Sequence, residues 1–522
     1  MKPEKRDVES WRRRGVDRIR DTREEQIRPE RSDRPDRASR IDKRDNSKRK
    51  KKKIRSKPII VLGSFYSVLF AALIIYICNY AYSNRQVLLN NSYNTRQQIL
   101  LAQNYRGQIL SRDGDVLAYT TTGEDGKDKR VYPYEREFAH VVGYSTNGKA
   151  GIESAANYYL INTSIDLQDK VKLDAQGSKY PGDNVYTTLD VKLQEVAFNA
   201  LSARKGAIVV TNPKTGEVLA MVSKPDYDPN TIAQDWDSLI ADKSPDAKLL
   251  NRATQGVYPP GSTFKIVTAL AYLRDHPNNY QDYRFSCNGR FTYEGNTIQC
   301  FHGENHGAVN FTSSFAKSCN SSFANMGVDI KRSTFNDTLK YLLFNTELPI
   351  TTLYSKSSAV YDASTTTDDV MQLSIGQGTT TVTPMHMNMI TCAIANDGVL
   401  MKPYLVSSVK SDTGKLVKSF SSESYKRLIS QNESDILTEM MEQVVQSGTA
   451  SKLKGLSYTA AGKTGSAEYN TSTSDSHAWF TGFAPADDPE ICVTIIVEDA
   501  GSGGSYAVPI AKRIFDAYFG VE

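Results

Sequence analysis

The sequence predicts an α+β protein in which helices flank an antiparallel sheet, preceded by a smaller irregular α+β region and one membrane-spanning helix. Two apolar runs around an Asn-Pro-Lys-Thr-Gly turn, residues 206–223, have the signature of a β-hairpin. Two further apolar strands, 477–485 and 491–500, precede a helical apolar pattern at 508–519. Hairpins flanked by helices indicate an antiparallel sheet with helices packed on it.

Composition and charge are those of an ordinary globular protein and argue against a nucleic-acid binder. Of 522 residues, 39% are hydrophobic and 24% charged, which excludes collagen, coiled-coil and disulfide-scaffold classes. Residues 1–57 hold 24 Lys+Arg and 12 Asp+Glu, whereas the remaining residues carry 40 basic and 47 acidic groups. A nucleic-acid binder would place its positive charge on the folded part, so nucleic acid is not an expected partner.

The N-terminal part predicts a tail and a membrane anchor. Residues 1–57 have almost no apolar side chains, so we expect a disordered, basic cytoplasmic tail. The uncharged run Ile59–Cys78 predicts a transmembrane helix over 58–82. A buried core helix or a cleaved signal peptide is also apolar, but this run is long, begins late and lacks a small-x-small site at its end. The Lys/Arg cluster 48–57 keeps the N-terminus cytoplasmic by the positive-inside rule and places the rest outside.

The part beyond the membrane divides where the sequence pattern changes, near residue 180. Residues 83–178 are polar and rich in Tyr and Asn, with short apolar runs between glycine-containing turns. That pattern predicts a small irregular α+β region. After alternation at Val185–Leu189 the spacing becomes helical, so we expect a larger second domain over 179–522.

The segment YPPGSTFKIVTALAYL carries the strongest chemical signal. The run from Phe264 to Leu273 is apolar nearly all round, as in a buried helix, and such a helix should not carry Lys265 without a reason. Ser262 and Lys265 are three residues apart, so their side chains share one face. Desolvation lowers the pKa of a lysine, and a neutral lysine can act as general base for a serine nucleophile.

Three short motifs occur more than once, and only context selects among the copies. Ser-x-x-Lys occurs six times and Ser-x-Asn five times. Lys-Thr-Gly occurs twice: 214–216 lies in the hairpin turn, and 463–465 lies in an extended stretch bordered by small residues. The second copy suits an edge strand with which a substrate backbone could pair.

The order Ser262, Ser318, Lys463 resembles the penicillin-binding proteins, whose motifs are Ser-x-x-Lys, Ser-x-Asn and Lys-Thr-Gly. NRATQGVYPPGSTFK, SCNSSFANMG, LSIGQGTTTVTP and AGKTGSAE are also similar to strings of that family. The resemblance covers roughly 84–522. RGQILSRDGDVLAY and GKAGIE, with the anchor, resemble the class B members. It implies a penicillin-binding transpeptidase fold with an all-helical subregion over 179–522, preceded by a non-catalytic pedestal over 83–178.

The resemblance also implies a catalytic role for each of five residues. Ser262 would attack the penultimate D-Ala carbonyl of a peptidoglycan stem peptide, and Lys265 would take the serine proton. Ser318 would relay a proton to the leaving amine. Asn320 would hold the substrate amide, and Lys463 would support the network electrostatically.

The Lys-Thr-Gly strand would bind substrate through Thr464, Gly465 and Ser466. The hydroxyls of Thr464 and Ser466 would hold the terminal carboxylate, and the backbone N–H groups of Ser262 and Ser466 would form the oxyanion hole. Many members have Thr where this chain has Ser466, but the hydroxyl is retained.

The function implied is a peptidoglycan D,D-transpeptidase of cell-wall synthesis, inhibited by β-lactams. An acceptor amine from a neighbouring stem would resolve the acyl-enzyme into a cross-link. We expect no cofactor and no metal, and as partner a polytopic membrane glycan polymerase. A β-lactam-sensing or β-lactam-hydrolysing protein on the same fold, and a catalytically idle scaffold, are the alternatives. A role in elongation and cell shape, in cell division or in sporulation is left open.

Cysteines and histidines offer one further pattern. Cys287-x12-Cys300-x-His302-x3-His306 loosely resembles a zinc spacing. In a Gly/Asn-rich region outside the cell, a Cys287–Cys300 disulfide or two unpaired thiols is the favoured interpretation. His477 is interpreted as structural, because Lys265 already supplies a base.

Overall fold

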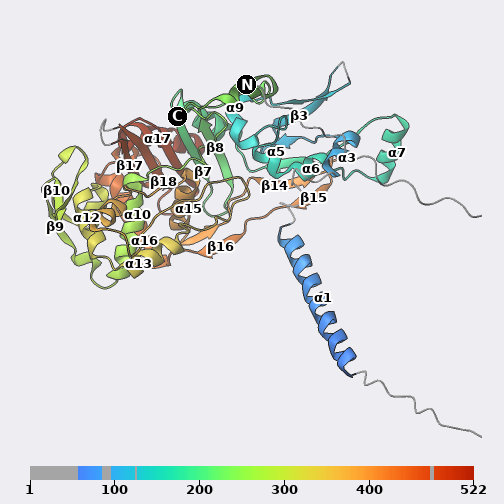
Figure 1. Cartoon of the computed structure of the whole chain (residues 1–522). Helices are drawn as coiled ribbons and strands as arrows, with labels where there is room; N and C mark the ends of the chain where they lie inside the picture. The colour runs from blue at the N-terminus through green and yellow to red at the C-terminus, as the bar shows by residue number, and fades with distance from the viewer. Residues whose placement is uncertain (1–56, 85–95, 124–125, 471–474, 522) are drawn as a thin grey trace, which may run out of the picture. The chain divides into compact units, whose positions relative to one another are not determined.

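The computed structural model describes residues 57–84, 96–123, 126–470 and 475–521 (Figure 1). The predicted tail, 1–57, lies outside the described residues except for Lys57. One helix near the N-terminus, α1 (Lys57–Ser83), is long and apolar enough to cross a membrane, and none of its residues is buried. It fits a single-pass membrane anchor.

The larger fold is built on a five-stranded antiparallel sheet in the order β17-β18-β19-β7-β8. Its strands are β7 (Gly206–Thr211), β8 (Val218–Lys224), β17 (Ala461–Asn470), β18 (Asp475–Ala484) and β19 (Ile491–Val497). β7, β8 and β19 are buried along their whole length, and therefore their sequences read as continuous apolar runs. The predicted hairpin is confirmed as β7–β8, with its Lys-Thr-Gly copy in the turn.

Helices cover the sheet on both faces. α8 (Val191–Leu201) and α17 (Gly503–Phe519) contact each other on one face, and α15 (Pro384–Ala395) lies on the other (Figure 1). α15 is buried at every residue, and its polar side chains bond to the sheet. Asn388 accepts from Thr211 Oγ1 at 2.6 Å, and the Thr391 and Thr481 hydroxyls lie 2.6 Å apart.

A mainly helical region packs beside this sheet. Its helices are α10 (Lys265–Asp275), α11 (Phe311–Ala316), α12 (Asn320–Asp329), α13 (Arg332–Tyr341), α14 (Thr367–Ser374) and α16 (Gln431–Ser447). Between α10 and α11 the chain forms two small antiparallel pairs, β9 (Arg284–Cys287) with β12 (Gly307–Asn310) and β10 (Arg290–Tyr293) with β11 (Asn296–Gln299). β13 (Val399–Met401) pairs with β16 (Ser424–Arg427).

The pedestal combines short helices with two sheets. The helices are α3 (Arg96–Gln103), α4 (Ala139–Val142), α5 (Gly151–Ala155), α6 (Asn157–Ile161) and α7 (Leu167–Ala175). β1 (Asn104–Tyr105) pairs with β5 (Tyr180–Pro181). A six-stranded sheet has the order β15-β14-β6-β2-β3-β4 and contains β2 (Ile109–Leu110), β3 (Val116–Thr122), β4 (Asp128–Val131), β6 (Asn184–Thr187), β14 (Val406–Lys410) and β15 (Leu416–Ser419).

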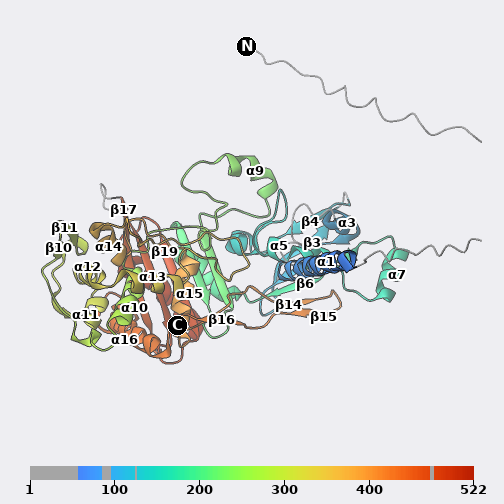
Figure 2. The ribbon, with the colours of Figure 1, turned by 60° about the horizontal axis from the view of Figure 1, so that its bottom comes forward.

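The sequence did not predict that β14 and β15 belong to the pedestal sheet. These strands come from the middle of the larger predicted domain, 179–522, yet they extend the pedestal sheet through β6, as both views show (Figure 1, Figure 2). One hydrophobic cluster runs from the pedestal into the five-stranded sheet and its helices. The two regions therefore share a core. α9 (Ile232–Ala241) lies between β8 and α10 along the chain.

A buried ion cluster holds the pedestal together. The Glu153 carboxylate is fully buried and accepts from Arg106 Nε at 2.5 Å and from Arg130 Nε at 2.7 Å. Arg106 also donates to Asn157 Oδ1 at 2.7 Å. Burial by itself would raise the pKa of Glu153, but the two guanidiniums keep that pKa below its usual value.

Replacing Glu153 should destabilise the protein strongly, because two buried cations would lose their counter-ion. Glu153→Gln should cost about 3–5 kcal/mol in urea unfolding. Asp128→Asn, which breaks a half-exposed pair with Lys179, should cost at most about 1 kcal/mol.

The effect should also depend on pH with a defined sign. Because the folded pKa of Glu153 is lowered, its contribution should be present above roughly pH 4.3, its unfolded pKa, and lost as pH falls toward the folded value. Equal stability of wild type and Glu153→Gln at neutral pH would contradict this account.

Candidate active site

Ser262 lies on a 3-10 turn, η2 (Gly261–Phe264), directly before α10. This turn packs against β17, because a Cβ on Gly261 would come within 3.0 Å of the Ser466 carbonyl oxygen and of Ala467 Cα. Gly261 also has φ +51°, a conformation that glycine adopts without strain. The candidate nucleophile is thereby placed beside the Lys-Thr-Gly strand.

Lys265 begins the buried helix α10, and its amine lies among oxygen atoms. Its side chain is fully buried. Lys265 Nζ lies within hydrogen-bonding distance of four oxygens: Ser262 Oγ (2.9 Å), Ser318 O (2.6 Å), Ser318 Oγ (3.2 Å) and Asn320 Oδ1 (2.6 Å). The structure thus brings the first two predicted motifs into direct contact.

Burial lowers the pKa of Lys265 to about 7, because desolvation disfavours the charged amine. The nearby Cys319 and Cys300 act in the opposite direction and limit this lowering. The Ser318 carbonyl and Asn320 Oδ1 can only accept, so they take the two protons of a neutral amine. The remaining lone pair is then available to the Ser262 hydroxyl at 2.9 Å.

Ser318 connects the two buried lysines. Its Oγ accepts from Lys463 Nζ at 2.9 Å and lies 3.2 Å from Lys265 Nζ. Burial lowers the pKa of Lys463 well below its usual value, and the charge of Lys265 lowers it further. Ser318 has φ +56°, a left-handed conformation unusual for a serine. A hydroxyl held between two desolvated amines can exchange protons with either.

The Lys-Thr-Gly copy at 463–465 lies on β17, at the edge of the five-stranded sheet, as its sequence predicted. β17 pairs with β18 on one side only, so its other edge is open to an extended ligand backbone. A Cβ on Gly465 would come within 3.2 Å of Pro260 O, Trp479 Cβ and Thr263 Cγ2, so a side chain there would push β17 away from the Ser262 turn. Thr464 Oγ1 lies 2.5 Å from Thr449 Oγ1, and Ser466 Oγ accepts from the Gly503 N–H at 3.4 Å.

Several supporting residues were not predicted as part of the site. Glu498 accepts from Arg252 Nε and from the Tyr258 hydroxyl, both at 2.7 Å, and so fixes the loop that leads to Ser262. Trp479 Nε1 donates to Pro259 O at 3.1 Å. These groups lie up to 246 residues apart in the sequence. Arg252, Tyr258 and Pro259 lie in the string NRATQGVYPPGSTFK, which could have indicated them, whereas Glu498 and Trp479 lie outside the quoted strings.

Gln377 braces the other end of β17. In the amide orientation that satisfies both of its groups, Gln377 donates to the Glu468 carbonyl (2.9 Å) and accepts from the Glu468 N–H (3.0 Å). The adjacent Gly376 carbonyl accepts from the Gly261 N–H at 2.9 Å. One short segment, Gly376–Gln377, therefore bonds both to the Ser262 turn and to β17.

The group of cysteines and histidines that the structure brings together differs in one member from the group that the sequence spacing suggested. Cys287, Cys300 and His306 come together, but the fourth member of the group is Cys319, from the Ser-x-Asn motif, and not His302. All six cysteines are free thiols, so the Cys287–Cys300 disulfide is not formed. His477 packs its ring against Tyr258 and accepts from the Asp499 N–H, consistent with a structural role.

Comparisons with known proteins identify the family to which this chain belongs. Residues 206–516 match the family described as "Penicillin binding protein transpeptidase domain", and residues 106–185 match "Penicillin binding protein A dimerisation domain". The chain belongs to the penicillin-binding protein transpeptidase family. Its identification as a class B member is confirmed, and so is the predicted fold class.

Curated relatives cover most of the chain. It is 33% identical over 463 residues to Peptidoglycan D,D-transpeptidase PbpA of Mycolicibacterium smegmatis, which spans 81% of this chain and 91% of the relative. It is 31% identical over 455 residues to Peptidoglycan D,D-transpeptidase MrdA of Acinetobacter baumannii, covering 74% of this chain and 65% of the relative.

Solved structures agree with the sequence relatives. The D,D-transpeptidase domain of a peptidoglycan glycosyltransferase from Eggerthella lenta superposes with a TM-score of 0.71 at 31% identity, covering 80% of this chain and 99% of that one. The penicillin G acyl-enzyme of penicillin-binding protein A from Mycobacterium tuberculosis superposes with a TM-score of 0.72 at 28% identity, covering 80% and 100%. A penicillin thus acylates a protein of this fold and family.

Proposed function

We propose that this class B penicillin-binding protein is a serine-type peptidoglycan D,D-transpeptidase that cross-links stem peptides through an acyl-enzyme on Ser262. The observation that carries the proposal is the contact of Lys265 Nζ with Ser262 Oγ, 2.9 Å apart, inside a site that lowers the pKa of the lysine to about 7. A neutral amine at that distance is a competent general base at neutral pH.

Acylation begins when Lys265 takes the Ser262 proton and the serine oxygen attacks the penultimate D-Ala carbonyl. The backbone N–H groups of Ser262 and Ser466 receive the developing oxyanion, a term typically worth about 3–4 kcal/mol of barrier. The close approach of the Ser262 turn to Ser466 supports this pairing of donors. Ser318 carries a proton to the leaving amine of D-Ala, supplied through its contacts with Lys265 and Lys463.

Substrate binding uses the open edge of β17. The stem peptide pairs with the strand at Gly465, and its terminal carboxylate binds the hydroxyls of Thr464 and Ser466. Asn320 Nδ2 already donates to Gln299 O at 3.0 Å, and its Oδ1 accepts from Lys265, so the amide is fixed where it contacts the substrate. An acceptor amine from a second stem then attacks the ester, which releases Ser262 and forms the cross-link.

The alternative of a β-lactam sensor or hydrolase is not favoured. The curated relatives are named D,D-transpeptidases, and the four hydrogen-bond partners of Lys265 are hydroxyl, carbonyl and amide oxygens, with no carboxylate among them. Fast hydrolysis of the ester needs a group that activates water. A β-lactam therefore remains bound as a stable acyl-enzyme and inhibits the protein.

The membrane arrangement follows from charge. The Lys/Arg cluster 48–57 precedes α1, so the positive-inside rule keeps the N-terminus in the cytoplasm and the Ser262 site outside it. A D,D-transpeptidase acts on nascent glycan strands, and a polytopic glycan polymerase is the partner that would supply them. An anchor confines both proteins to one plane and raises their encounter frequency.

Labelling with a fluorescent penicillin tests the nucleophile. Wild type should gain one covalent adduct by intact-mass spectrometry, and Ser262→Ala should gain none, because the attacking oxygen is lost. Ser451→Ala is a matched control, since Ser451 also begins a Ser-x-x-Lys string but is exposed, and it should label normally. An adduct on Ser262→Ala would overturn the assignment.

The acylation rate should depend on pH with a midpoint set by Lys265. The neutral amine is the active form and its pKa lies at about 7, so the rate should rise as pH increases through about 7 and then level off. Stopped-flow measurement with a chromogenic cephalosporin from pH 5.5 to 9 checks this. A rate that is constant across that range, or that still rises steeply at pH 9, would mean that another group is the base.

The polymerase contact can be divided between anchor and pedestal. On α7 the side chains of Leu167 and Val171, one helical turn apart, are 75% and 59% exposed. Together these two side chains offer a small apolar surface that a partner could cover. Leu167→Gln/Val171→Gln should reduce co-purification with a polymerase and leave penicillin acylation unchanged, whereas Lys172→Gln on the same helix should change neither.

A second variant tests the anchor separately. Replacing residues 59–78 by an unrelated apolar span, with the Lys/Arg cluster kept, should lower co-purification if α1 contributes specific contacts. Unchanged co-purification for both the span and the α7 variants would remove both contact sites from the proposal.

A further inference from the structure

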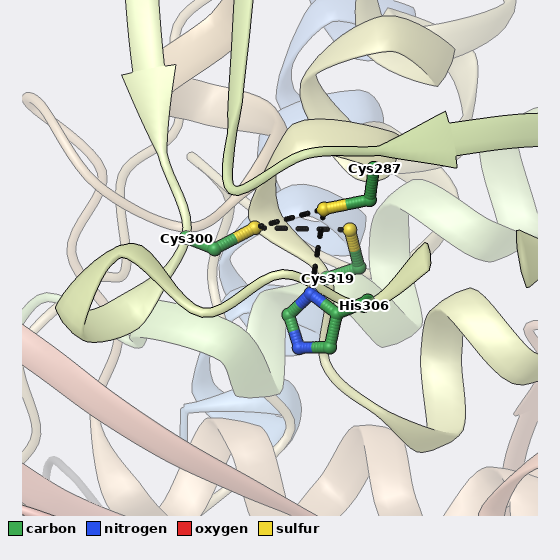
Figure 3. A group of neighbouring side chains, drawn as sticks. All are labelled: Cys287, Cys300, His306 and Cys319. Atoms are coloured by element: carbon green, nitrogen blue, oxygen red, sulfur yellow. Dashed lines mark hydrogen bonds between the residues drawn. The ribbon is translucent and has the colours of Figure 1, made fainter. Parts of the chain in front are cut away.

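Four side chains from four positions along the chain meet next to the Ser-x-Asn motif. Cys287 ends β9, Cys300 follows β11, His306 precedes β12, and Cys319 precedes α12 (Figure 3). Their ligand atoms, three sulfurs and one imidazole nitrogen, all lie within 4.8 Å of one another. The exposed fractions of the three cysteines are 2%, 3% and 0%, and that of the His306 side chain is 5%.

Three of the six distances among these atoms are those expected between ligands of one tetrahedral ion. With Zn–S bonds of about 2.3 Å and Zn–N bonds of about 2.0–2.1 Å, tetrahedral angles place two sulfurs about 3.8 Å apart and a sulfur and a nitrogen about 3.6 Å apart. The observed separations are 3.7 Å for Cys287–Cys300, 3.8 Å for Cys300–Cys319 and 3.5 Å for Cys287 Sγ–His306 Nδ1. A disulfide would need about 2.05 Å.

The surroundings of the sulfurs are suited to thiolates. Each sulfur has a donor from outside the group, as structural metal sites usually provide. These donors are Gly289 N–H to Cys287 (3.4 Å), the Ser321 hydroxyl to Cys300 (3.2 Å) and Ser322 N–H to Cys319 (3.4 Å). His306 turns Nδ1 to the group and Nε2 toward Glu304, whose carboxylate lies 3.6 Å away. A carboxylate near the far nitrogen favours the tautomer that leaves Nδ1 free to bind a metal.

We propose that this protein binds one structural zinc ion through Cys287, Cys300, His306 and Cys319. Three cysteines and one histidine are an established ligand set for zinc, and four protein ligands leave no open position for catalysis. The sequence pattern alone favoured a disulfide or free thiols, because the region is rich in Gly and Asn and was expected outside the cell. Folding replaces the exposed His302 by Cys319, which is buried, and supplies the missing soft ligand.

The ion would brace the catalytic motif. Cys319 lies between Ser318 and Asn320, the two residues that surround the Lys265 amine. Cys300 follows Gln299, whose carbonyl accepts from Asn320 Nδ2 at 3.0 Å. Zinc bound to both cysteines therefore fixes both ends of the hydrogen bond that orients Asn320. The ligands act as positioning residues and not as catalytic residues.

The fold of residues 284–310 gives an independent reason for an ion. Each of its four short strands buries at most one residue, and its two sheets have only two strands each. Two-stranded pairs with so little apolar burial are marginal by themselves. A metal that ties three points of this segment to α12 supplies the missing free energy.

Metal analysis of the full chain, purified in detergent without chelators, tests the site directly. We expect one zinc per chain by inductively coupled plasma mass spectrometry, falling well below one in Cys319→Ser and His306→Asn. His302→Asn lies four residues from His306 and should keep one zinc, as should Cys392→Ser, a buried cysteine outside the group. Less than a tenth of a zinc per chain in a wild type whose thiols are reduced, or a Cys287–Cys300 disulfide in non-reducing peptide maps, would overturn the site.

Cobalt substitution keeps the test valid if a variant fails to fold. Co²⁺ added to metal-free wild type should give intense visible bands of tetrahedral coordination and near-ultraviolet thiolate charge-transfer bands. Bands of an octahedral, thiolate-free site would overturn the assignment of ligands.

The bracing role rests on the proposed function and has its own readout. Removing zinc should slow penicillin acylation of Ser262 roughly tenfold or more at a temperature where the metal-free protein is still folded. If a protein that held one zinc is acylated at the same rate after the zinc has been removed, the bracing role is overturned but the zinc site is not. Absence of acylation in zinc-loaded wild type would instead overturn the proposed function.

Discussion

Burial of the Lys265 amine is the constraint on which the rest of the site depends. A charged amine in a low-dielectric interior is costly, so the protein must either neutralise it or surround it with acceptors. Here both occur, since three of the surrounding oxygens come from Ser318 and Asn320 and burial lowers the pKa to about 7. The Ser-x-Asn motif therefore supplies the oxygen acceptors that this buried amine requires.

Much of the architecture could be predicted because its signals are local. An uncharged run of membrane length predicted α1, and continuous apolar runs around a turn predicted β7–β8. Small residues around Lys463 predicted an edge strand. What could not be predicted was pairing between distant segments. β14 and β15 have no local feature that assigns them to the pedestal sheet, since β14 reads as a partly buried strand wherever it pairs. That assignment depends on contacts made more than two hundred residues away.

The same limit separates the parts of the site that were predicted from those that were missed. Ser262 and Lys265 share one helical face, so their contact follows from spacing, and the family resemblance supplied Ser318, Asn320 and Lys463. Supporting groups such as Glu498 and Gln377 bond to the site from other elements, and no periodicity marks them. In the metal cluster, spacing suggested His302, which is near in sequence, whereas the fold selected Cys319.

The Lys265 amine is connected by hydrogen bonds to segments that carry none of the three motifs. Asn320 links Lys265 to Gln299, and Gln299 adjoins Cys300 in the cysteine and histidine group, so the local order of 284–310 reaches the amine through two hydrogen bonds. On the opposite side, Gly376 and Gln377 bond to the Ser262 turn and to β17. Because an acceptor moved by even 1 Å no longer makes a good hydrogen bond, the contact of Asn320 with Lys265 depends on the segment that holds Gln299. A segment that contributes none of the three motifs can in this way position the oxygen atoms around the Lys265 amine.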